Sequence, residues 1–268
     1  MLVSADMLPP FQPSLRVLVV DDNELNQLVV CRALEEWNVA ATLADNGRQA
    51  VALATTQAFD VVLMDVQMPE MDGYEATRQL RGHSHLQRLP IIGLTASTSP
   101  EDQARARVAG MNATLAKPFD PALLHASLVC YTSGAGFSGI QKKLVSLAGS
   151  GTVRPDWGIL EELAAGNRAF IAQIITTFLQ QTPPLYQQLV TAASIADDPL
   201  TPARLAHKLK GQVVYFGVPA IQQHLEKLER SVTTTAAATN DHLIALIGDQ
   251  LTALYPYLAA RLHKYQSE

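Results

Sequence analysis

Short runs of aliphatic residues alternate with segments of helical spacing through the first half of the chain. Such runs are typical of buried strands, and apolar residues that recur every three or four positions indicate amphipathic helices. The pattern predicts strands at 17–20, 39–43, 61–64, 91–94 and 114–116, and helices at 24–36, 47–55, 73–81, 100–109 and 121–129. Because parallel strands need helical crossovers, we expect a doubly wound α/β fold with a five-stranded parallel sheet.

The second half carries helical stripes and no strand pattern. From residue 155 onward, apolar residues recur at helical spacing to the end of the chain. Pro183 and Pro184 predict a kink or a restart in one of these helices. Thr201 and Pro202 predict the cap and first turn of the next, which we expect to end at Gly217. The stripes together predict an antiparallel, all-α helical bundle.

This change of pattern divides the chain into two domains, as its length of 268 residues favours. Residues 15–132 form the α/β domain and residues 155–268 form the helical bundle. Residues 1–14 contain three prolines and are expected to be a flexible tail. Residues 133–154, in which Gly, Ser and Thr cluster, are expected to be a linker.

Charge and composition narrow the class of partner. The net charge of −5 argues against nucleic acid, which is bound by clustered Lys and Arg. Cys31 and Cys130 are the two cysteines, and both lie in apolar helical patterns. We therefore expect buried free thiols, which fit a reducing cytoplasm. No apolar run reaches the ~18–20 residues of a membrane span, and no secretory signal is apparent, so we expect a cytoplasmic chain without a membrane segment.

Polar residues stand where several of the predicted strands end. Asp21, Asp22, Asp65, Thr95 and Lys117 each follow or close an apolar run. In an open parallel sheet these ends meet at one edge, where ligands bind. Three crowded carboxylates need a cation, and hard oxygen ligands suit Mg²⁺. With that metal bound, Asp65 can attack a phosphoryl group while the metal and Lys117 stabilise the transferred oxygens.

Residues 15–132 resemble a response-regulator receiver domain. The resemblance rests on four motifs, which are Val-Val-Asp-Asp-Asn at 19–23, Leu-Met-Asp-Val-Gln-Met-Pro at 63–69, Leu-Thr-Ala at 94–96 and Ala-Lys-Pro-Phe at 116–119. It implies the same parallel-sheet fold and a Mg²⁺-dependent phosphoryl transfer to an aspartate. One departure is Thr114, because many receivers carry an aromatic residue three positions before the lysine. An output switch that depends on that ring is not expected here.

The resemblance also implies roles for individual residues. Asp65 would be the phosphoacceptor, and Asp22 would bind Mg²⁺ directly with Asp21 as its partner in the acidic pocket. Asp65 and the backbone carbonyl of Gln67 would complete the metal site. Thr95 and Lys117 would bind the phosphoryl oxygens.

A histidine with a nearby lysine stands on one predicted helix of the bundle. His207 lies two residues from Leu205, about 200° round the helix axis, and should therefore point away from the core. Lys210 and Gly211 follow at the spacings that His207 can reach. The lysine offers a cation to a phosphoryl group, and the glycine leaves room for a partner. A neutral imidazole is a competent nucleophile.

Residues 155–268 resemble a histidine-containing phosphotransfer (HPt) domain. The family signature His-x-Leu-Lys-Gly is intact at 207–211, and Gly217 stands where a second glycine is common. Gln212 replaces the small residue often seen after the first glycine. The resemblance implies a helical bundle in which His207 accepts and donates a phosphoryl group.

The two resemblances together predict a phosphorelay protein of the kind found at the C-terminal end of hybrid sensor histidine kinases. The chain has no ATP-binding kinase core, so a sensor histidine kinase, separate or upstream, must phosphorylate it, and a downstream response-regulator receiver must accept the group. An aspartyl-phosphate hydrolase is one alternative, but that class needs a carboxylate where Gln67 stands. A non-catalytic docking adaptor is the other, and the intact acceptor residues argue against it.

Overall fold

The computed structural model describes residues 8–96, 99–132, 153–193, 200–231 and 237–267. Its contacts divide the chain into two compact units, Met1–Lys143 and Leu144–Glu268. Most of the predicted linker, residues 133–152, and residues 1–7 of the predicted tail lie outside the described residues.

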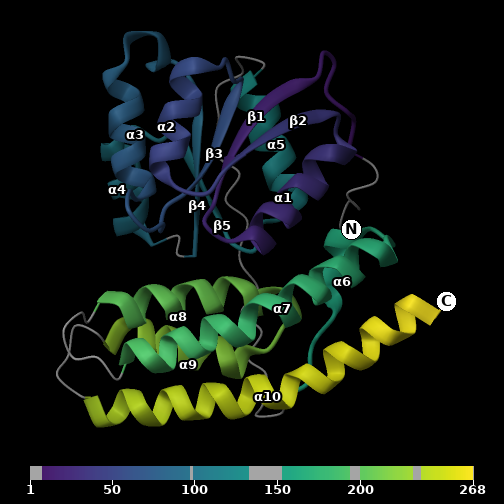
Figure 1. Cartoon of the computed structure of the whole chain (residues 1–268). Helices are drawn as coiled ribbons and strands as arrows, with labels where there is room; N and C mark the ends of the chain where they lie inside the picture. Colours follow the sequence, from purple (N-terminus) through teal and green to yellow (C-terminus); the bar gives the residue numbers. More distant parts are fainter. Residues whose placement is uncertain (1–7, 97–98, 133–152, 194–199, 232–236, 268) are drawn as a thin grey trace. The chain divides into compact units, whose positions relative to one another are not determined.

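The first unit is a five-stranded parallel sheet between two layers of helices. The strands lie in the order β2-β1-β3-β4-β5, with α1 and α5 on one face and α2, α3 and α4 on the other (Figure 1). This confirms the predicted doubly wound fold. The strands are β1 (Leu15–Val20), β2 (Val39–Ala44), β3 (Val61–Asp65), β4 (Ile91–Thr95) and β5 (Ala113–Ala116), and the helices are α1 (Glu24–Glu36), α2 (Gly47–Thr56), α3 (Gly73–Gly82), α4 (Pro100–Ala109) and α5 (Pro121–Thr132).

The strand order fixes where the acidic residues meet. Strands β1 and β3 are neighbours, with Val20 paired to Met64, so the residues that follow them leave the sheet side by side. The connections from β1 and β3 run to helices on opposite faces, which makes this end of the sheet a topological switch point. Both strands are completely buried where they approach it, so the site rests on a rigid base.

Part of the predicted flexible tail is held against the first unit. The backbone N–H of Phe11 donates to the carbonyl of Trp37, and the side-chain amide of Asn38 donates to the carbonyl of Phe11. The ring of His125 lies 2.8 Å from the carbonyl of Pro9 and packs against both Phe11 and Trp37. Aromatic packing and hydrogen bonds thus link Pro9 and Phe11 of the predicted tail to the rest of the first unit.

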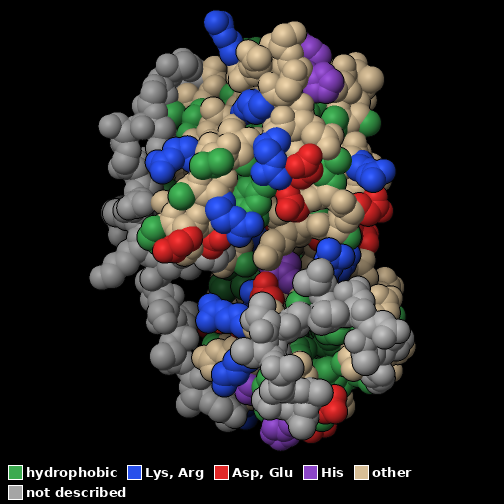
Figure 2. All heavy atoms as spheres, turned by 90° about the vertical axis from the view of Figure 1, so that its left-hand side faces the viewer, with side chains coloured by type: hydrophobic (Ala, Val, Ile, Leu, Met, Phe, Trp, Pro, Cys, Tyr) green, Lys and Arg blue, Asp and Glu red, His purple; other side chains and the backbone are tan. Residues whose placement is uncertain are grey.

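Side chains of both signs of charge lie on one face of the first unit. On the side that carries α3 and α4, basic and acidic side chains alternate among hydrophobic ones (Figure 2). Arg78 and Glu75 of α3, for example, form an exposed pair at 2.8 Å. Nucleic-acid binding proteins instead gather basic side chains into one patch.

The second unit is a helical bundle, as predicted. Helices α7, α8, α9 and α10 pack in a closed ring in which each contacts the next and α10 returns to α7, while α6 precedes them (Figure 1). The apolar stripes of the helices meet in its core. The elements are α6 (Gly158–Ala164), α7 (Arg168–Ala193), α8 (Leu200–Val213), the short 3₁₀ turn η3 (Val214–Phe216), α9 (Pro219–Ser231) and α10 (Ala237–Ser267).

Two details of this unit differ from the predictions. Helix α7 continues through Pro183 and Pro184 instead of stopping or restarting. Each proline inside a helix costs about 3 kcal/mol. The side chains of Leu185 and Leu189, which follow the prolines, are buried in the core, and their burial contributes about 2 kcal/mol each and offsets much of that cost. Helix α8 begins at Leu200, so Thr201 lies inside its first turn rather than at its cap, whereas Pro202 lies in the first turn as predicted.

Gly217 ends the α8–η3 segment, as predicted. Its φ of +57° is in the left-handed region that favours glycine. A Cβ there would lie 2.7 Å from the Cβ of Asp156, whose backbone N–H donates to the carbonyl of Phe216. The glycine thus allows the chain before α6 to pack against the end of η3.

Helix α10 is the one described helix that is long and apolar enough, by length and composition alone, to cross a membrane, over Asn240–Gln266. This part of the chain carries the predicted final stripe, and its buried members line the core of the bundle. They are Ile244, Ile247, Leu251, Leu254 and Leu258. Such a helix passes the same test when it belongs to the core of a helical bundle.

Candidate functional site

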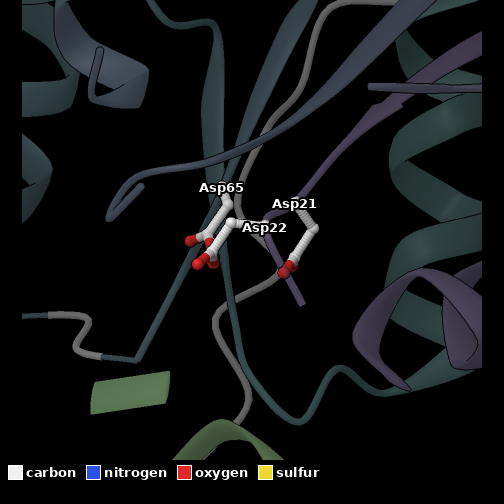
Figure 3. A group of neighbouring side chains, drawn as sticks. All are labelled: Asp21, Asp22 and Asp65. Carbon is white, nitrogen blue, oxygen red and sulfur yellow. The ribbon is translucent and has the colours of Figure 1, made fainter. Parts of the chain in front are cut away.

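The three predicted aspartates meet at the carboxyl end of the sheet. Asp21 and Asp22 follow β1, Asp65 closes β3, and one carboxylate oxygen from each of the three lies within 4.8 Å of the other two. Figure 3 shows the carboxylates of Asp22 and Asp65 close together, with that of Asp21 beside them. Asp21 and Asp65 are buried, whereas Asp22 is partly exposed. The cluster therefore opens toward solvent on the side of Asp22.

Lys117 neutralises part of this cluster. Its Nζ lies 2.6 Å from Oδ2 of Asp21 and 2.8 Å from Oδ2 of Asp65. Its backbone N–H donates to the carbonyl of Thr95, which fixes the lysine at the end of β5. Burial alone would lower the pKa of Lys117, but the two carboxylates outweigh burial and raise it. The ammonium is therefore a permanent cation of the site.

The arrangement suits a divalent cation. Counted at their formal charges, three carboxylates and one ammonium leave an excess of two negative charges in a small space. Oδ1 of Asp21 accepts hydrogen bonds from the backbone N–H of Asn23 and the side-chain amide of Asn26, and its Oδ2 accepts from Lys117. The donor set is all oxygen, as Mg²⁺ requires.

Two further predicted residues lie at the same edge. Thr95 closes β4 and is buried, with Ala116 of β5 as its register partner. Gln67 is exposed, and its backbone N–H lies 3.3 Å from Oδ1 of Asp65. Gly73 packs directly against the backbone of Asp65, because a Cβ at position 73 would collide with the carbonyl oxygen of Asp65. All the residues predicted for the aspartate site thus come together.

Thr114 lies in β5 with Gly93 as its register partner, and it is partly exposed. A Cβ at Gly93 would lie 3.4 Å from Cγ2 of Thr114 and 2.7 Å from the sulfur of Met111. The small threonine and the glycine therefore pack closely at the position where an aromatic ring would stand.

His207 is less open than predicted. Its side chain is 17% exposed, and its Nδ1 lies 2.8 Å from Oε1 of Glu229 on α9. It was expected to point away from the core, and its partly exposed side chain lies at the edge of the core and faces Glu229. The most deeply buried residues of its α8 turn are Ala206 and Leu209 rather than Leu205, so His207 flanks the core and faces α9.

Glu229 also binds the lysine of the signature. The ammonium of Lys210 donates to its Oε2, so one carboxylate holds both His207 and Lys210. Burial alone would raise the pKa of Glu229, but the hydrogen bond from His207 and the charges of His207 and Lys210 lower it to about 2. An ionised carboxylate only accepts hydrogen bonds, so the Nδ1 of His207 carries the proton.

Gly211, which ends the signature, and Gln212, which follows it, have distinct environments. Gly211 is partly exposed and presents no side chain beside His207. Gln212 is buried, and its Oε1 accepts a hydrogen bond from the hydroxyl of Thr182 on α7 at 2.9 Å. Its long side chain therefore points into the bundle, away from the exposed surface of Gly211.

Both units match known families. Residues 17–129 match the response regulator receiver domain, and residues 173–260 match the Hpt domain. The two matches cover about three quarters of the chain. The chain is a receiver–HPt protein of two-component phosphorelay signalling. The receiver–HPt order is the order that the sequence motifs predicted.

This receiver–HPt protein is similar to part of each of two much longer kinases. The signal transduction histidine-protein kinase BarA of Escherichia coli K12 is 30% identical over 221 residues, which are 82% of this chain and 24% of BarA. The sensor histidine kinase GacS of Pseudomonas protegens is 32% identical over 248 residues, 87% of this chain and 26% of GacS. The chain therefore spans about a quarter of the length of these relatives.

Among solved structures, the receiver unit is similar to the receiver domain of the sensor histidine kinase PA1611 from Pseudomonas aeruginosa PAO1. The two are 40% identical, with a TM-score of 0.43, and the match covers 45% of this chain and 98% of that one. The PA1611 structure has a magnesium ion coordinated in its active-site cleft.

Two polar residues of the receiver–HPt protein were not found from the sequence. Glu229 lies 22 positions from His207 on another helix, and Asn26 lies in the first turn of α1 as one of several amides there. Finding either would have required knowing which helix faces meet. The spacing of residues within one helix carries no such information.

Proposed function

We propose that this chain relays a phosphoryl group between two acceptors, Asp65 and His207. A sensor histidine kinase, separate or upstream in a longer polypeptide, supplies the group from a phosphohistidine to Asp65. The group exchanges with His207, and the aspartate of a downstream response-regulator receiver accepts it. The observation that carries this proposal is the pairing of an ordered acidic cluster around Asp65 with a histidine whose Nδ1 is held by Glu229.

The receiver step needs a nucleophilic carboxylate that is accessible and partly neutralised. Asp65 lies beside Lys117, whose ammonium can stabilise the oxygens of an incoming phosphoryl group. Thr95 stands at the same edge and can donate its hydroxyl to such an oxygen. In the transfer the N–P bond of the donor phosphohistidine breaks and an O–P bond to Asp65 forms.

The residues present fit Mg²⁺, with Asp22, Asp65 and the backbone carbonyl of Gln67 as proposed ligands and Asp21 as their partner in the acidic pocket. When bound, the metal would supply positive charge next to the transferred phosphoryl oxygens. Its binding would also offset the repulsion among the three carboxylates, which Lys117 balances only in part.

The histidine step needs an imidazole nitrogen that carries a lone pair. Glu229 accepts a hydrogen bond from the Nδ1–H of His207, so in the neutral imidazole Nε2 carries the lone pair that can attack phosphorus. The O–P bond to Asp65 then breaks as the N–P bond to Nε2 forms. The phosphorylated ring carries positive charge on its Nδ1–H side, which the carboxylate of Glu229 stabilises. Lys210 adds a cation near the incoming oxygens.

We propose a cytoplasmic location. Support comes from Cys31 and Cys130, which are both partly buried and are not joined in a disulfide, as is usual in a reducing compartment. Burial and Glu35 raise the pKa of Cys31 to about 11, so its thiol is protonated and unreactive.

The test is labelling of the full chain with a radioactive acyl phosphate in the presence of Mg²⁺, followed by acid and base treatment. Aspartyl phosphate is lost in base, and phosphohistidine is lost in acid. We expect both kinds of label on the wild type, neither on Asp65→Asn, and only base-labile label on His207→Gln. His224→Gln is the matched control, because His224 is also a partly buried histidine hydrogen-bonded to a neighbouring helix, through Gln250.

The same experiment separates the alternatives. An aspartyl-phosphate hydrolase would release inorganic phosphate in steady turnover and accumulate little label. A docking adaptor would take up no label. Acid-labile label that persists on His207→Gln would contradict the assignment of His207.

A further inference from the structure

The least exposed carboxylate of the acidic cluster is surrounded by amide groups of the following helix. Asp21 is 0% exposed, and a carboxylate so deeply buried needs several hydrogen-bond donors. Its Oδ1 accepts from the backbone N–H of Asn23 at 3.0 Å and from Nδ2 of Asn26 at 3.0 Å. Both donors come from the start of α1, immediately after the aspartates.

As a result, the two carboxylate oxygens of Asp21 have different partners. Oδ1 is turned toward α1, where the two N–H groups fix it. Oδ2 is thereby turned toward the cluster, where it accepts from Lys117 at 2.6 Å. Rotation of the carboxylate about its terminal torsion would break these contacts, so Asn26 and Lys117 together hold it in one orientation.

Gln27 fixes the backbone of the same residue. Its Nε2 donates to the carbonyl of Asp21 at 2.7 Å and to Oδ1 of Asp45 at 3.1 Å. It also lies 3.3 Å from the carbonyl of Ala44 at the end of β2. Asn26 and Gln27 are only 5% and 6% exposed. Two adjacent amides of one helical turn thus control both the side chain and the main chain of Asp21.

We propose that Asn26 is a positioning residue of the acidic cluster, which orients Asp21 so that its Oδ2 faces Lys117 and the Mg²⁺ site, with Gln27 as its backbone support. This inference rests on the proposed function, because it assigns Asn26 to the site at which Asp65 is phosphorylated. Residues that orient metal-site carboxylates typically change metal affinity or activity by 10–100-fold when they are replaced.

The test is a calorimetric titration of Mg²⁺ into the full chain. Asn26→Leu keeps the approximate shape of the side chain and removes its donor, and we expect about tenfold weaker Mg²⁺ binding. Labelling by an acyl phosphate should then require correspondingly more Mg²⁺ and recover when Mg²⁺ is saturating. Gln27→Met should weaken binding less, because it leaves the side chain of Asp21 in place. If Asn26→Leu does not fold, Asn26→Ser carries the same test with a smaller side chain.

Asn46→Ala is the matched control. Asn46 caps α2, where its Oδ1 accepts from the backbone N–H of Gln49 at 2.9 Å, and within the described part of the chain it makes no hydrogen bond to the aspartates of the cluster. Its loss should lower the melting temperature, as the loss of any helix cap does, and leave Mg²⁺ affinity unchanged. A purely structural role for Asn26 would give the same result as this control.

The outcomes separate this inference from the proposed function. Wild-type Mg²⁺ affinity in a folded Asn26→Leu chain would overturn the role of Asn26 even if Asp65 is labelled normally. If the wild type binds Mg²⁺ but takes up no label, the proposed function fails, and weaker binding by Asn26→Leu still supports the positioning role. A wild-type chain that does not bind Mg²⁺ overturns the positioning role as well.

Discussion

Nδ1 of His207 lies 2.8 Å from Oε1 of Glu229, and this contact joins α8 to α9. The contact gives the imidazole a defined tautomer with the proton on Nδ1, since an ionised carboxylate can only accept a hydrogen bond. The contact also ties the acceptor to Lys210, which the other oxygen of Glu229 holds. The phosphotransfer signature of one helix is therefore completed by a residue of the next.

The first prediction concerns this tautomer. Glu229→Ala removes the acceptor of the Nδ1 proton, so part of the His207 population should carry its proton on Nε2 and lose the nucleophilic lone pair. We expect phosphoryl transfer to slow by about tenfold, as the loss of one hydrogen bond to a charged group suggests. Nitrogen chemical shifts of His207 would measure the two tautomers directly.

Glu226→Gln is the control for this change. Glu226 lies on the same helix and forms a more exposed pair with Arg230 at 2.6 Å. Its replacement should leave both the tautomer of His207 and the transfer rate unchanged, because exposed pairs of this kind contribute little. An unaltered tautomer in Glu229→Ala would contradict the proposed role of Glu229.

The second prediction concerns acid stability of the HPt unit. The pKa of Glu229 is lowered from 4.5 to about 2, so its ionised form stabilises the folded unit above about pH 4.5, and this contribution is lost as the pH falls toward 2. If the whole pKa shift appeared as unfolding free energy, the contribution would be about 3 kcal/mol. Because the carboxylate is partly exposed, solvent screening makes the contribution smaller.

Urea unfolding of Glu229→Gln and the wild type, compared from neutral to acid pH, would measure this term. Both chains should carry Trp37→Phe, so that Trp157 of the HPt unit is the one remaining tryptophan. The wild type should lose more unfolding free energy on acidification than Glu229→Gln. Equal losses in the two chains would mean that the Glu229 pair does not contribute.

The sequence predicted the receiver fold almost completely for a physical reason. Its strands are continuous aliphatic runs between polar ends, so the period, the boundaries and the acidic edge are all local features. The predicted helix at 24–36 and the helix at 100–109 agree with α1 and α4 at both ends. The phosphorylation motifs follow strand ends and were brought together by the topology alone.

What the sequence did not reveal depends on contacts between elements. The rule that proline breaks helices failed at Pro183 and Pro184, because core packing on both sides holds α7 together. The facing of His207 toward α9 was not predicted, because the burial of α8 is centred on Ala206 and Leu209. Phe11 was assigned to a tail because its partners, Trp37 and His125, lie far along the chain.

The third prediction concerns strain in the loop after Asp65. Glu70 has a φ of +64°, in the left-handed region, and its side chain is exposed. A residue other than glycine in this backbone conformation destabilises the folded state by about 1–2 kcal/mol. Glycine avoids this strain, and the stability it loses because its unfolded chain is more flexible is smaller. We expect Glu70→Gly to stabilise the receiver unit by about 0.5–1 kcal/mol. Glu70→Ala keeps the strain and should bring no gain, so a comparable gain from alanine would contradict this explanation.

The fourth prediction concerns the balance of charge around Asp65. Lys117 lies 2.6 Å from Asp21 and 2.8 Å from Asp65, and both carboxylates are buried. Lys117→Met keeps much of the side-chain volume and removes the cation. It should destabilise the receiver unit by about 3–5 kcal/mol in the absence of metal, because two buried charges lose their partner. The midpoint of urea unfolding, followed by Trp37 in chains that carry Trp157→Phe, would measure the loss.

Added Mg²⁺ should recover part of this loss. A ligand that binds only the folded state stabilises it by an amount that grows with the logarithm of the ratio of its concentration to its Kd. The acidic cluster attracts a cation more strongly when the ammonium of Lys117 is absent. Mg²⁺ should therefore raise the urea midpoint of Lys117→Met more than that of the wild type. Arg16→Met is the control, because Arg16 forms an exposed pair with Asp60 at 3.7 Å, and its loss should change neither stability nor the response to Mg²⁺. If Mg²⁺ stabilises Lys117→Met and the wild type equally, the ammonium and the metal do not share the charge of Asp21 and Asp65.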